Sequence, residues 1–255
     1  MHRNRNQLSP GFTTGQTRSA GGLLEILLSI ALLSIAIVAI LTAFLLPSIR
    51  RGPAPAHRAQ CKNNLKQIGL ALHNYHETHG AFPPACTVDA NGTPLHSWRT
   101  LILPFLDQQP LFEKIGRSKP WNDPANAEAY ATPVPAFVCP STDIPAGHTT
   151  YQALVGPDCA FRPGQPRQIR DFKDGTSNSV LVVDASPSIA VHWMDPSDSA
   201  RSFFLSFDEE SEFPHSSGCH VLLGDGSVKF ISGAVPKKTR TALSDIADGE
   251  AIDPF

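Results

Sequence analysis

An apolar run near the N-terminus restricts the fold more than any other feature of the sequence. Residues 23–46 are 24 residues of Leu, Ile, Ala, Val, Phe, Ser and Thr, interrupted by a single charge, Glu25. A helix needs about 20 such residues to cross the hydrocarbon core of a bilayer. The apolar core of a cleaved secretory signal is shorter, about 7–15 residues. The run therefore predicts a transmembrane helix, which we place at residues 21–46.

Glu25 is the informative exception in this run, because a carboxylate in lipid is costly and needs a partner. A basic leader, a small residue and a glutamate five positions into a long apolar helix resemble the type IV prepilin cleavage and methylation motif. The resemblance makes residues 1–20 a cytoplasmic leader, Ala20 the residue before the cut and Gly21 the first residue of the mature chain. It also implies that Glu25 pairs with the new N-terminal amine during filament assembly. The alternative is an uncleaved signal anchor with an interfacial glutamate.

Flanking charge and the prepilin resemblance disagree about orientation. Three basic residues precede the apolar run and five follow it before residue 83, which by charge alone would put the C-terminal side in the cytoplasm. The resemblance implies the opposite, and we follow it: a single-pass protein of the cytoplasmic membrane, with the N-terminus in the cytoplasm and an extracytoplasmic head. After residue 82 the chain has 13 basic and 21 acidic residues. This acidic balance argues against nucleic acid as a partner, because phosphates are bound by clustered Lys and Arg.

The segment after the apolar run, residues 47–82, predicts a kinked stem and an amphipathic helix. The sequence GPAP at residues 52–55 should break the first helix, because each proline removes a donor and clashes with the preceding turn. A second helix can start near His57 and end at Gly80. One of its faces carries residues at alternating steps of four and three. They are Cys61, Leu65, Ile68, Leu72, Tyr75 and His79.

The predicted helix near His57 begins an ordered series of short motifs. It reads CKNNLKQIGLALHNYH from residue 61 and is followed by GAFPP at 80–84. Further motifs follow: SWR at 97–99, LPFL at 103–106, FVCPS at 137–141, DGTSN at 174–178, and His215 with Asp225-Gly226 ten residues on, the H-x9-DG element. In their identity and order these motifs resemble a large bacterial family, domain of unknown function 1559. The resemblance covers about residues 20–250. It implies a pilin-like N-terminal helix and an α+β head, whose biochemical role is largely unassigned.

The head, residues 83–255, is expected to be α+β, with an antiparallel sheet and short helices. Runs rich in β-branched and aromatic residues predict strands at 149–155, 179–183 and 189–193. Two apolar runs, 219–224 and 227–231, flank Asp225-Gly226 and predict a hairpin with a type I′ turn. Asp123 followed by Pro124 predicts the start of a short helix, and residues 236–247 predict a last one.

Two motifs of the head offer oxygen or nitrogen ligands, and each has a plainer interpretation. His215 is expected to form a structural hydrogen bond beside the hairpin of Asp225 and Gly226; the alternative is a catalytic His–Asp pair. Asp174, Thr176 and Asn178 are weak candidates for a calcium site, because all three carry side-chain oxygens. Their spacing is shorter than that of an EF-hand loop, so an Asx turn is the preferred interpretation.

The five cysteines allow at most two disulfides and leave at least one thiol. Cys61 and Cys139 lie in motifs that the family resemblance covers. The resemblance makes them the first candidates for a disulfide in an oxidising compartment. The alternative is five reduced and partly buried thiols.

Two functional hypotheses follow. The first is a pseudopilin-like structural subunit of a type II secretion or type IV pilus-like assembly, with membrane lipid, a prepilin peptidase and other pseudopilin-like subunits as partners. The second is a membrane-anchored extracytoplasmic domain that binds or hydrolyses an unidentified ligand. The sequence contains no nucleophile elbow, phosphate loop or dinucleotide fingerprint, so we expect neither an enzyme nor a cofactor.

Overall fold

The computed structural model describes residues 21–50, 54–250 and 252, with side chains over 25–40, 55–250 and 252. The leader with Ala20 and the expected helix break at Pro53 lie outside the described residues. The chain divides into two compact units, Met1–Gly52 and Pro53–Phe255. We call the second unit the head and describe each unit by itself.

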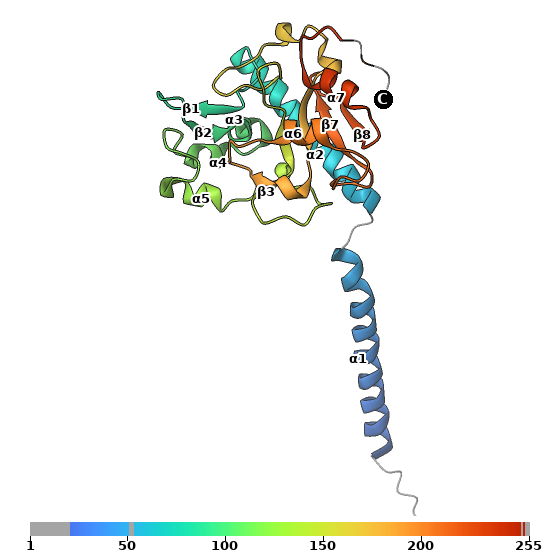
Figure 1. Cartoon of the computed structure of the whole chain (residues 1–255). Coiled ribbons are helices and arrows are strands. Elements are labelled where there is room, and N and C mark those ends of the chain that lie inside the picture. Colours follow the sequence, from blue (N-terminus) through green and yellow to red (C-terminus); the bar gives the residue numbers. More distant parts are fainter. Residues whose placement is uncertain (1–20, 51–53, 251, 253–255) are drawn as a thin grey trace, which may run out of the picture. The chain divides into compact units, whose positions relative to one another are not determined.

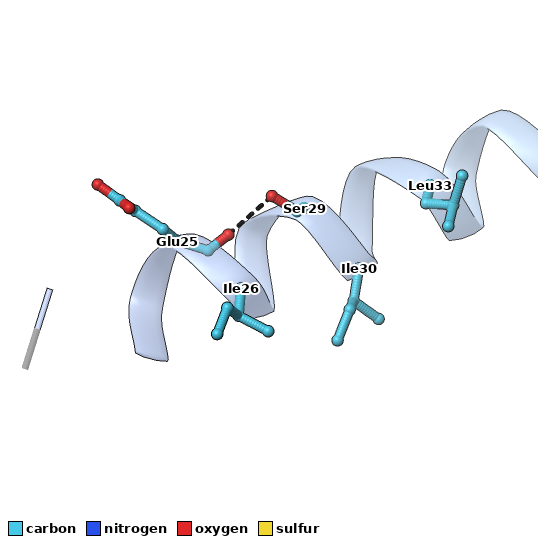
Figure 2. Close-up of a pocket in the computed structure, with 5 residues that line it drawn as sticks. All are labelled: Glu25, Ile26, Ser29, Ile30 and Leu33. Carbon is cyan, nitrogen blue, oxygen red and sulfur yellow. Dashed lines mark hydrogen bonds between the residues drawn. The ribbon is translucent and has the colours of Figure 1, made fainter. Parts of the chain in front are cut away.

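The first unit is a single helix, α1 (Gly21–Arg50). Every side chain described in it, from residue 25 to residue 40, is exposed. Figure 2 shows Ile26 and Ile30 on one side of this helix, with the Glu25 carboxylate directed away from them. In the described part of the chain, no helix is both long and apolar enough to cross a membrane.

The head combines short helices with short strands (Figure 1). Its α-helices are α2 (Ala54–His79), α3 (Trp98–Leu101), α4 (Gln109–Lys114), α5 (Ala127–Tyr130), α6 (Ala200–Ser206) and α7 (Lys237–Ser244). Its strands are β1 (Cys86–Val88), β2 (Pro94–Ser97), β3 (His148–Thr149), β4 (Tyr151–Ala153), β5 (Val180–Asp184), β6 (Val191–His192), β7 (Gly218–Leu223) and β8 (Val228–Ser232). Its 3-10 helices are η1 (Leu103–Leu106), η2 (Pro124–Asn126), η3 (Pro135–Phe137), η4 (Ile169–Asp171), η5 (Thr176–Asn178) and η6 (Pro187–Ile189).

The main sheet has four antiparallel strands in the order β4-β5-β7-β8. β1 pairs with β2 and β3 pairs with β6, also antiparallel. The expected α+β class with antiparallel strands and short helices is confirmed. Strands β5 and β7 are buried along their whole length, which explains why their sequences, VLVVD and GCHVLL, do not alternate between apolar and polar residues.

The main sheet is the middle of three layers. On one face, Leu65, Ile68 and Leu72 of α2 belong to the same core cluster as Leu222 of β7. On the other face, α6 and α7 pack in a second cluster with Val183 and Val221. A Cβ on Gly69 of α2 would come within 2.8 Å of Leu222 Cδ1, so glycine allows the close approach of α2 to β7. This layered packing brings α2, β5 and the loop before β7 close together.

The amphipathic helix predicted near His57 is α2, which begins three residues earlier, at Ala54. Pro55 is tolerated because the first turn of a helix has no intrahelical partner for its N–H groups. The predicted buried face is correct at Cys61, Leu65, Ile68 and Leu72, each of them fully buried, whereas His79 is exposed. Gly80 ends the helix with φ of +77°.

The predicted hairpin is β7 and β8, but the predicted turn type is wrong. The loop has three residues, Gly224, Asp225 and Gly226: Leu223 N–H donates to Ser227 O at 2.9 Å, and Gly226 N–H donates to Leu223 O at 2.9 Å. A type I′ turn would require positive φ at both Asp225 and Gly226. Gly226 has φ of +81°, but Asp225 is not among the described residues with positive φ. The extra loop residue is accommodated by the left-handed glycine, as in hairpins with a G1 bulge.

Replacing Gly226 by valine is expected to lower the free energy of unfolding of the head by about 1–3 kcal/mol, because a β-branched residue is strained at positive φ. A Cβ here meets nothing closer than 3.6 Å, so backbone strain and not a clash determines the loss. Trp98, Trp121 and Trp193 all lie in the head, so denaturation of the full chain followed by tryptophan fluorescence reports on the head alone. The control is Gly116→Ala, where φ is not in the left-handed region. Equal midpoints for Gly226→Val and the wild type would contradict the strain argument.

Candidate functional site

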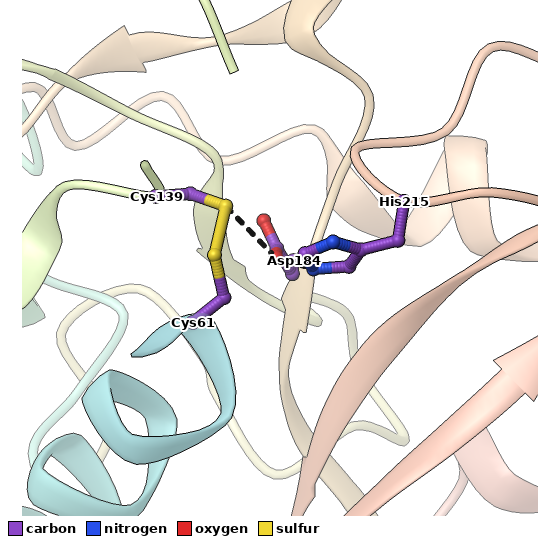
Figure 3. Close-up of side chains that lie close together, drawn as sticks. All are labelled: Cys61, Cys139, Asp184 and His215. Carbon is purple, nitrogen blue, oxygen red and sulfur yellow. Dashed lines mark hydrogen bonds and ion pairs between the residues drawn. A yellow bond between two sulfur atoms is a disulfide. The ribbon is translucent and has the colours of Figure 1, made fainter. Parts of the chain in front are cut away.

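Four chemically reactive side chains meet in the interior of the head. Cys61 comes from α2, Cys139 from the loop after η3, Asp184 from the last position of β5, and His215 from the loop before β7. One sulfur, nitrogen or oxygen atom from each lies within 4.8 Å of those of the other three. All four residues are buried. Figure 3 shows the Asp184 carboxylate between the two sulfur atoms and the His215 ring. We call this group the Cys–Asp–His cluster.

Cys61 and Cys139 are joined by a disulfide, with their Cα atoms 5.3 Å apart and a sequence separation of 78. This is the pair that the family resemblance suggested. It connects α2 to the loop that follows η3. The other three cysteines, Cys86, Cys159 and Cys219, are free and buried. Burial raises the pKa of the Cys159 thiol to about 11, so it stays protonated at neutral pH.

Asp184 is held by hydrogen bonds on both of its oxygens. Thr150 Oγ1 donates to Oδ1 at 2.5 Å, and His215 Nε2 lies 3.0 Å from Oδ2. The same Oδ2 lies 3.4 Å from Cys139 Sγ. Burial raises the pKa of the Asp184 carboxyl above its usual value, and the hydrogen bonds from His215 and Thr150 act in the opposite direction. The ionised form of Asp184 is therefore stabilised by these two hydrogen-bond donors.

The structural role expected for His215 is present, but with a different partner. The His215 ring pairs with Asp184 of β5, whereas its backbone oxygen accepts from Gly218 N–H of the hairpin at 3.3 Å. Asp225 lies in the hairpin loop, where its N–H donates to Thr176 O at 3.0 Å and its Oδ1 accepts from Ser227 N–H at 2.8 Å. The alternative of a His215–Asp225 catalytic pair is therefore wrong: the histidine and the aspartate of the H-x9-DG element serve different sites.

The weak calcium candidates form hydrogen bonds with backbone groups. Both oxygens of the Asp174 carboxylate accept backbone N–H groups, from Asp248 at 2.8 Å and Gly249 at 2.9 Å. Asn178 turns its amide nitrogen to the Asp174 backbone oxygen at 2.9 Å, and Thr176 presents its backbone oxygen to the hairpin loop. They fasten the C-terminal segment and the hairpin.

A cleft of about 370 Å³ opens beside the Cys–Asp–His cluster. His215 belongs to both the cleft and the cluster, and Ser141 of the cleft places its Oγ 3.7 Å from Cys61 Sγ. The lining residues are Pro55, His57, Arg58, Ser141, Pro214, His215 and Ser216. Ser141 and His215 therefore connect the cleft to the buried cluster.

The processing residues of the first unit are not part of this site. Ala20 lies outside the described residues, and Gly21 and Glu25 belong to α1. The backbone oxygen of Glu25 accepts a hydrogen bond from Ser29 Oγ at 2.9 Å, and its side chain is exposed.

Sequence reasoning missed Asp184 and Thr150. Asp184 ends a strand whose other residues are Val, Leu, Val and Val, all buried. A carboxylate at the end of such a run is a usable signal, because a buried acid requires hydrogen-bond donors or a cation. Thr150, immediately before β4, carries no signal of its own.

Comparison with known proteins gives one match. Residues 54–159 match the family described as a protein of unknown function, DUF1559. Over this segment the chain is similar to the DUF1559 family. No curated protein and no solved structure matches the chain. The DUF1559 match contains both disulfide cysteines, and Asp184 and His215 follow it in the sequence.

Proposed function

We propose that this protein is a pseudopilin-like structural subunit, anchored in the cytoplasmic membrane by α1 with the head outside the cytoplasm. The observation that carries the proposal is the surface of α1. Its described side chains are exposed, and large apolar ones such as Ile26, Leu28 and Leu33 occur on every side of the helix. A helix that is apolar all round requires apolar surroundings, and the apolar run of 24 residues suits the core of a bilayer.

Glu25 distinguishes a pseudopilin from a simple anchor. The four residues that line a pocket together with Glu25 are uncharged (Figure 2), and a carboxylate in lipid is stable only with a charged partner. In the proposal that partner is the N-terminal amine of a neighbouring subunit, freed by cleavage before Gly21. Within the head, the disulfide supports an extracytoplasmic location, because such bonds persist in oxidising compartments.

Replacing Glu25 by alanine is expected to leave membrane insertion intact or improved and to abolish recruitment into the assembly. Removing the carboxylate lowers the cost of burial in lipid and also removes the partner of the amine. Assembly is measured by cross-linking between subunits in native membranes. Insertion is measured by resistance to carbonate extraction of the same membranes.

The matched control is Ser34→Ala, which removes from α1 a hydroxyl that donates to the backbone oxygen of Ala31. It should insert and cross-link as the wild type does. The intact mass of the mature chain from the same membranes tests cleavage before Gly21. Cross-linking of Glu25→Ala at the wild-type level would overturn the structural-subunit proposal.

The cleft beside the Cys–Asp–His cluster favours a second candidate, a membrane-anchored extracytoplasmic domain that binds a ligand. Arg58 and His57 give this cleft basic side chains at its rim. If binding is the function, Glu25→Ala would leave it unchanged, whereas Arg58→Ala would weaken it. The two candidates therefore respond to different substitutions.

A further inference from the structure

The disulfide accounts for only two of the four residues in the Cys–Asp–His cluster. Asp184 Oδ2 lies 3.4 Å from Cys139 Sγ, and a disulfide sulfur has no proton to share with it. A fully buried carboxylate facing a sulfur atom therefore gains nothing from that contact while the disulfide is closed. The contact becomes favourable when Cys139 is a thiol, or when a cation lies between the sulfur and the oxygen.

The positions of the four ligand atoms suit a tetrahedral cation. Zinc binds thiolate sulfur at about 2.3 Å and imidazole nitrogen or carboxylate oxygen at about 2.0–2.2 Å, so the edges of its tetrahedron measure about 3.3–3.8 Å. The distance from Asp184 Oδ2 to His215 Nε2 is 3.0 Å, and that to Cys139 Sγ is 3.4 Å. All ligand atoms lie within 4.8 Å of one another. To reach these edges, the two sulfur atoms have to separate once the bond between them is broken. The Asp184–His215 distance has to lengthen by a few tenths of an ångström, and pairs as far apart as 4.8 Å have to move closer.

We propose that reduction of the Cys61–Cys139 disulfide converts the cluster into a zinc site with Cys61, Cys139, Asp184 and His215 as its four ligands. Two thiolates, an imidazole and a carboxylate match the ligand preference of Zn²⁺ and not that of Ca²⁺ or Mg²⁺, which take oxygen ligands. Four protein ligands leave no open position, so the site is structural.

Neighbouring residues complete the site. Thr150 Oγ1 holds Oδ1 of Asp184 at 2.5 Å and leaves Oδ2 toward the cluster, as an orienting hydrogen bond to a ligating carboxylate should. The cleft lined by Ser141 and His215 supplies an entry path for the ion. Thr150 is a positioning residue in this arrangement, because it acts through Asp184.

The conversion balances as follows. An external dithiol, a small molecule or a thioredoxin-like protein, supplies two electrons and two protons, becomes a disulfide, and leaves Cys61 and Cys139 as thiols. Zn²⁺ then displaces both thiol protons to solvent and binds the two thiolates, the Asp184 carboxylate and the neutral His215 ring. A chain newly made in the reducing cytoplasm would hold the metal form, and the oxidised chain outside would hold the disulfide.

The test uses the full chain in detergent, stripped of metal with a chelator and compared before and after reduction by a phosphine. Co²⁺ serves as the probe, because thiolate ligation gives a charge-transfer absorption and tetrahedral ligation a strong visible band. Zn²⁺ affinity is then measured by competition with a chromophoric chelator. The reduced chain should bind one Co²⁺ with thiolate absorption, and the oxidised chain should bind none.

The variants separate the four-residue site from the remaining thiols. The double variant Cys61→Ser/Cys139→Ser keeps Cys86, Cys159 and Cys219 and therefore gives the background of metal binding by these thiols. Asp184→Asn and His215→Ala should lose the absorption band of one bound Co²⁺ per chain. Thr150→Val should lower the affinity for Zn²⁺ about 10–100-fold. The matched control is His220→Gln, since His220 is also buried, with its ring centre 4.7 Å from that of His215, yet it lies outside the cluster.

Each outcome decides the proposal. Binding by the reduced wild type and by His220→Gln, with loss in His215→Ala and Asp184→Asn, would support it, provided that near-ultraviolet circular dichroism shows the variants folded. Thr150→Val guards against a variant that fails to fold, because it retains all four ligands. Reduced wild type that binds no more metal than the double cysteine variant, or His215→Ala that binds as tightly as the wild type, would overturn it.

Discussion

Arg99→Met is expected to destabilise the head by about 3–5 kcal/mol, the typical cost of leaving one partner of a buried ion pair behind. Arg99 is fully buried, and its Nη2 lies 2.6 Å from Asp198 Oδ1. Its other N–H groups donate to Asp198 Oδ2 at 3.1 Å and to the backbone oxygens of Trp193, Tyr151 and Asp195 at 3.0–3.1 Å. Removing the guanidinium leaves the Asp198 carboxylate and three carbonyls buried with fewer donors.

The measurement is chemical denaturation of the full chain, followed by far-ultraviolet circular dichroism and tryptophan fluorescence. The matched control is Arg201→Met, because Arg201 and Asp245 are 3.4 Å apart and their side chains are 33% and 17% exposed. A partly exposed pair contributes at most about 1 kcal/mol. Equal losses for the two variants would show that burial of the Arg99–Asp198 pair does not determine its contribution.

Removal of the disulfide is expected to have a comparable effect. In the chain-entropy model, a bond that closes a loop over 78 positions contributes about 4 kcal/mol by restricting the unfolded chain. Cys61→Ala/Cys139→Ala should therefore lower the free energy of unfolding by about that amount, measured in buffer with a chelator so that no metal replaces the bond.

A reductant provides the internal control for this prediction. It should shift the denaturation midpoint of the wild type toward that of the double variant and leave the double variant unchanged, because Cys86, Cys159 and Cys219 form no disulfide in the described structure. An equal shift in both proteins would attribute the effect to something other than the Cys61–Cys139 bond.

Local sequence patterns predicted the helices and strands of the head better than the long-range contacts between them. The apolar face of α2 was correct at Cys61, Leu65, Ile68 and Leu72, because a helical period is a local property of the sequence. Asp123 was correct as a cap, since its side chain accepts from Ala125 N–H at 2.9 Å at the start of η2. Residues 189–193 yield only a two-residue strand, because residues 187–189 form a 3-10 turn instead.

The Cys–Asp–His cluster could be predicted only in part. Cys61 and Cys139 were suggested by a family resemblance, whereas Asp184 and His215 meet because β5 pairs with β7 in one particular register. A sequence contains no local signal for such a pairing across 31 positions. The turn type of the hairpin was missed for a similar reason: Asp-Gly is compatible with two- and three-residue loops, and the pairing of Leu222 with Val228 selects the longer one.

The disulfide also determines how a pulling force would travel through the head. The head begins just before α2, and Cys61 lies near the N-terminal end of that helix. Tension applied at the N-terminal end of the head therefore reaches the sulfur–sulfur bond after a few residues and passes directly to Cys139. Residues 62–138, which include most of α2 and all of α3, α4 and α5, lie outside this load path. Under tension the head can lengthen by the segment before Cys61 and the segment after Cys139, while the enclosed loop carries no force.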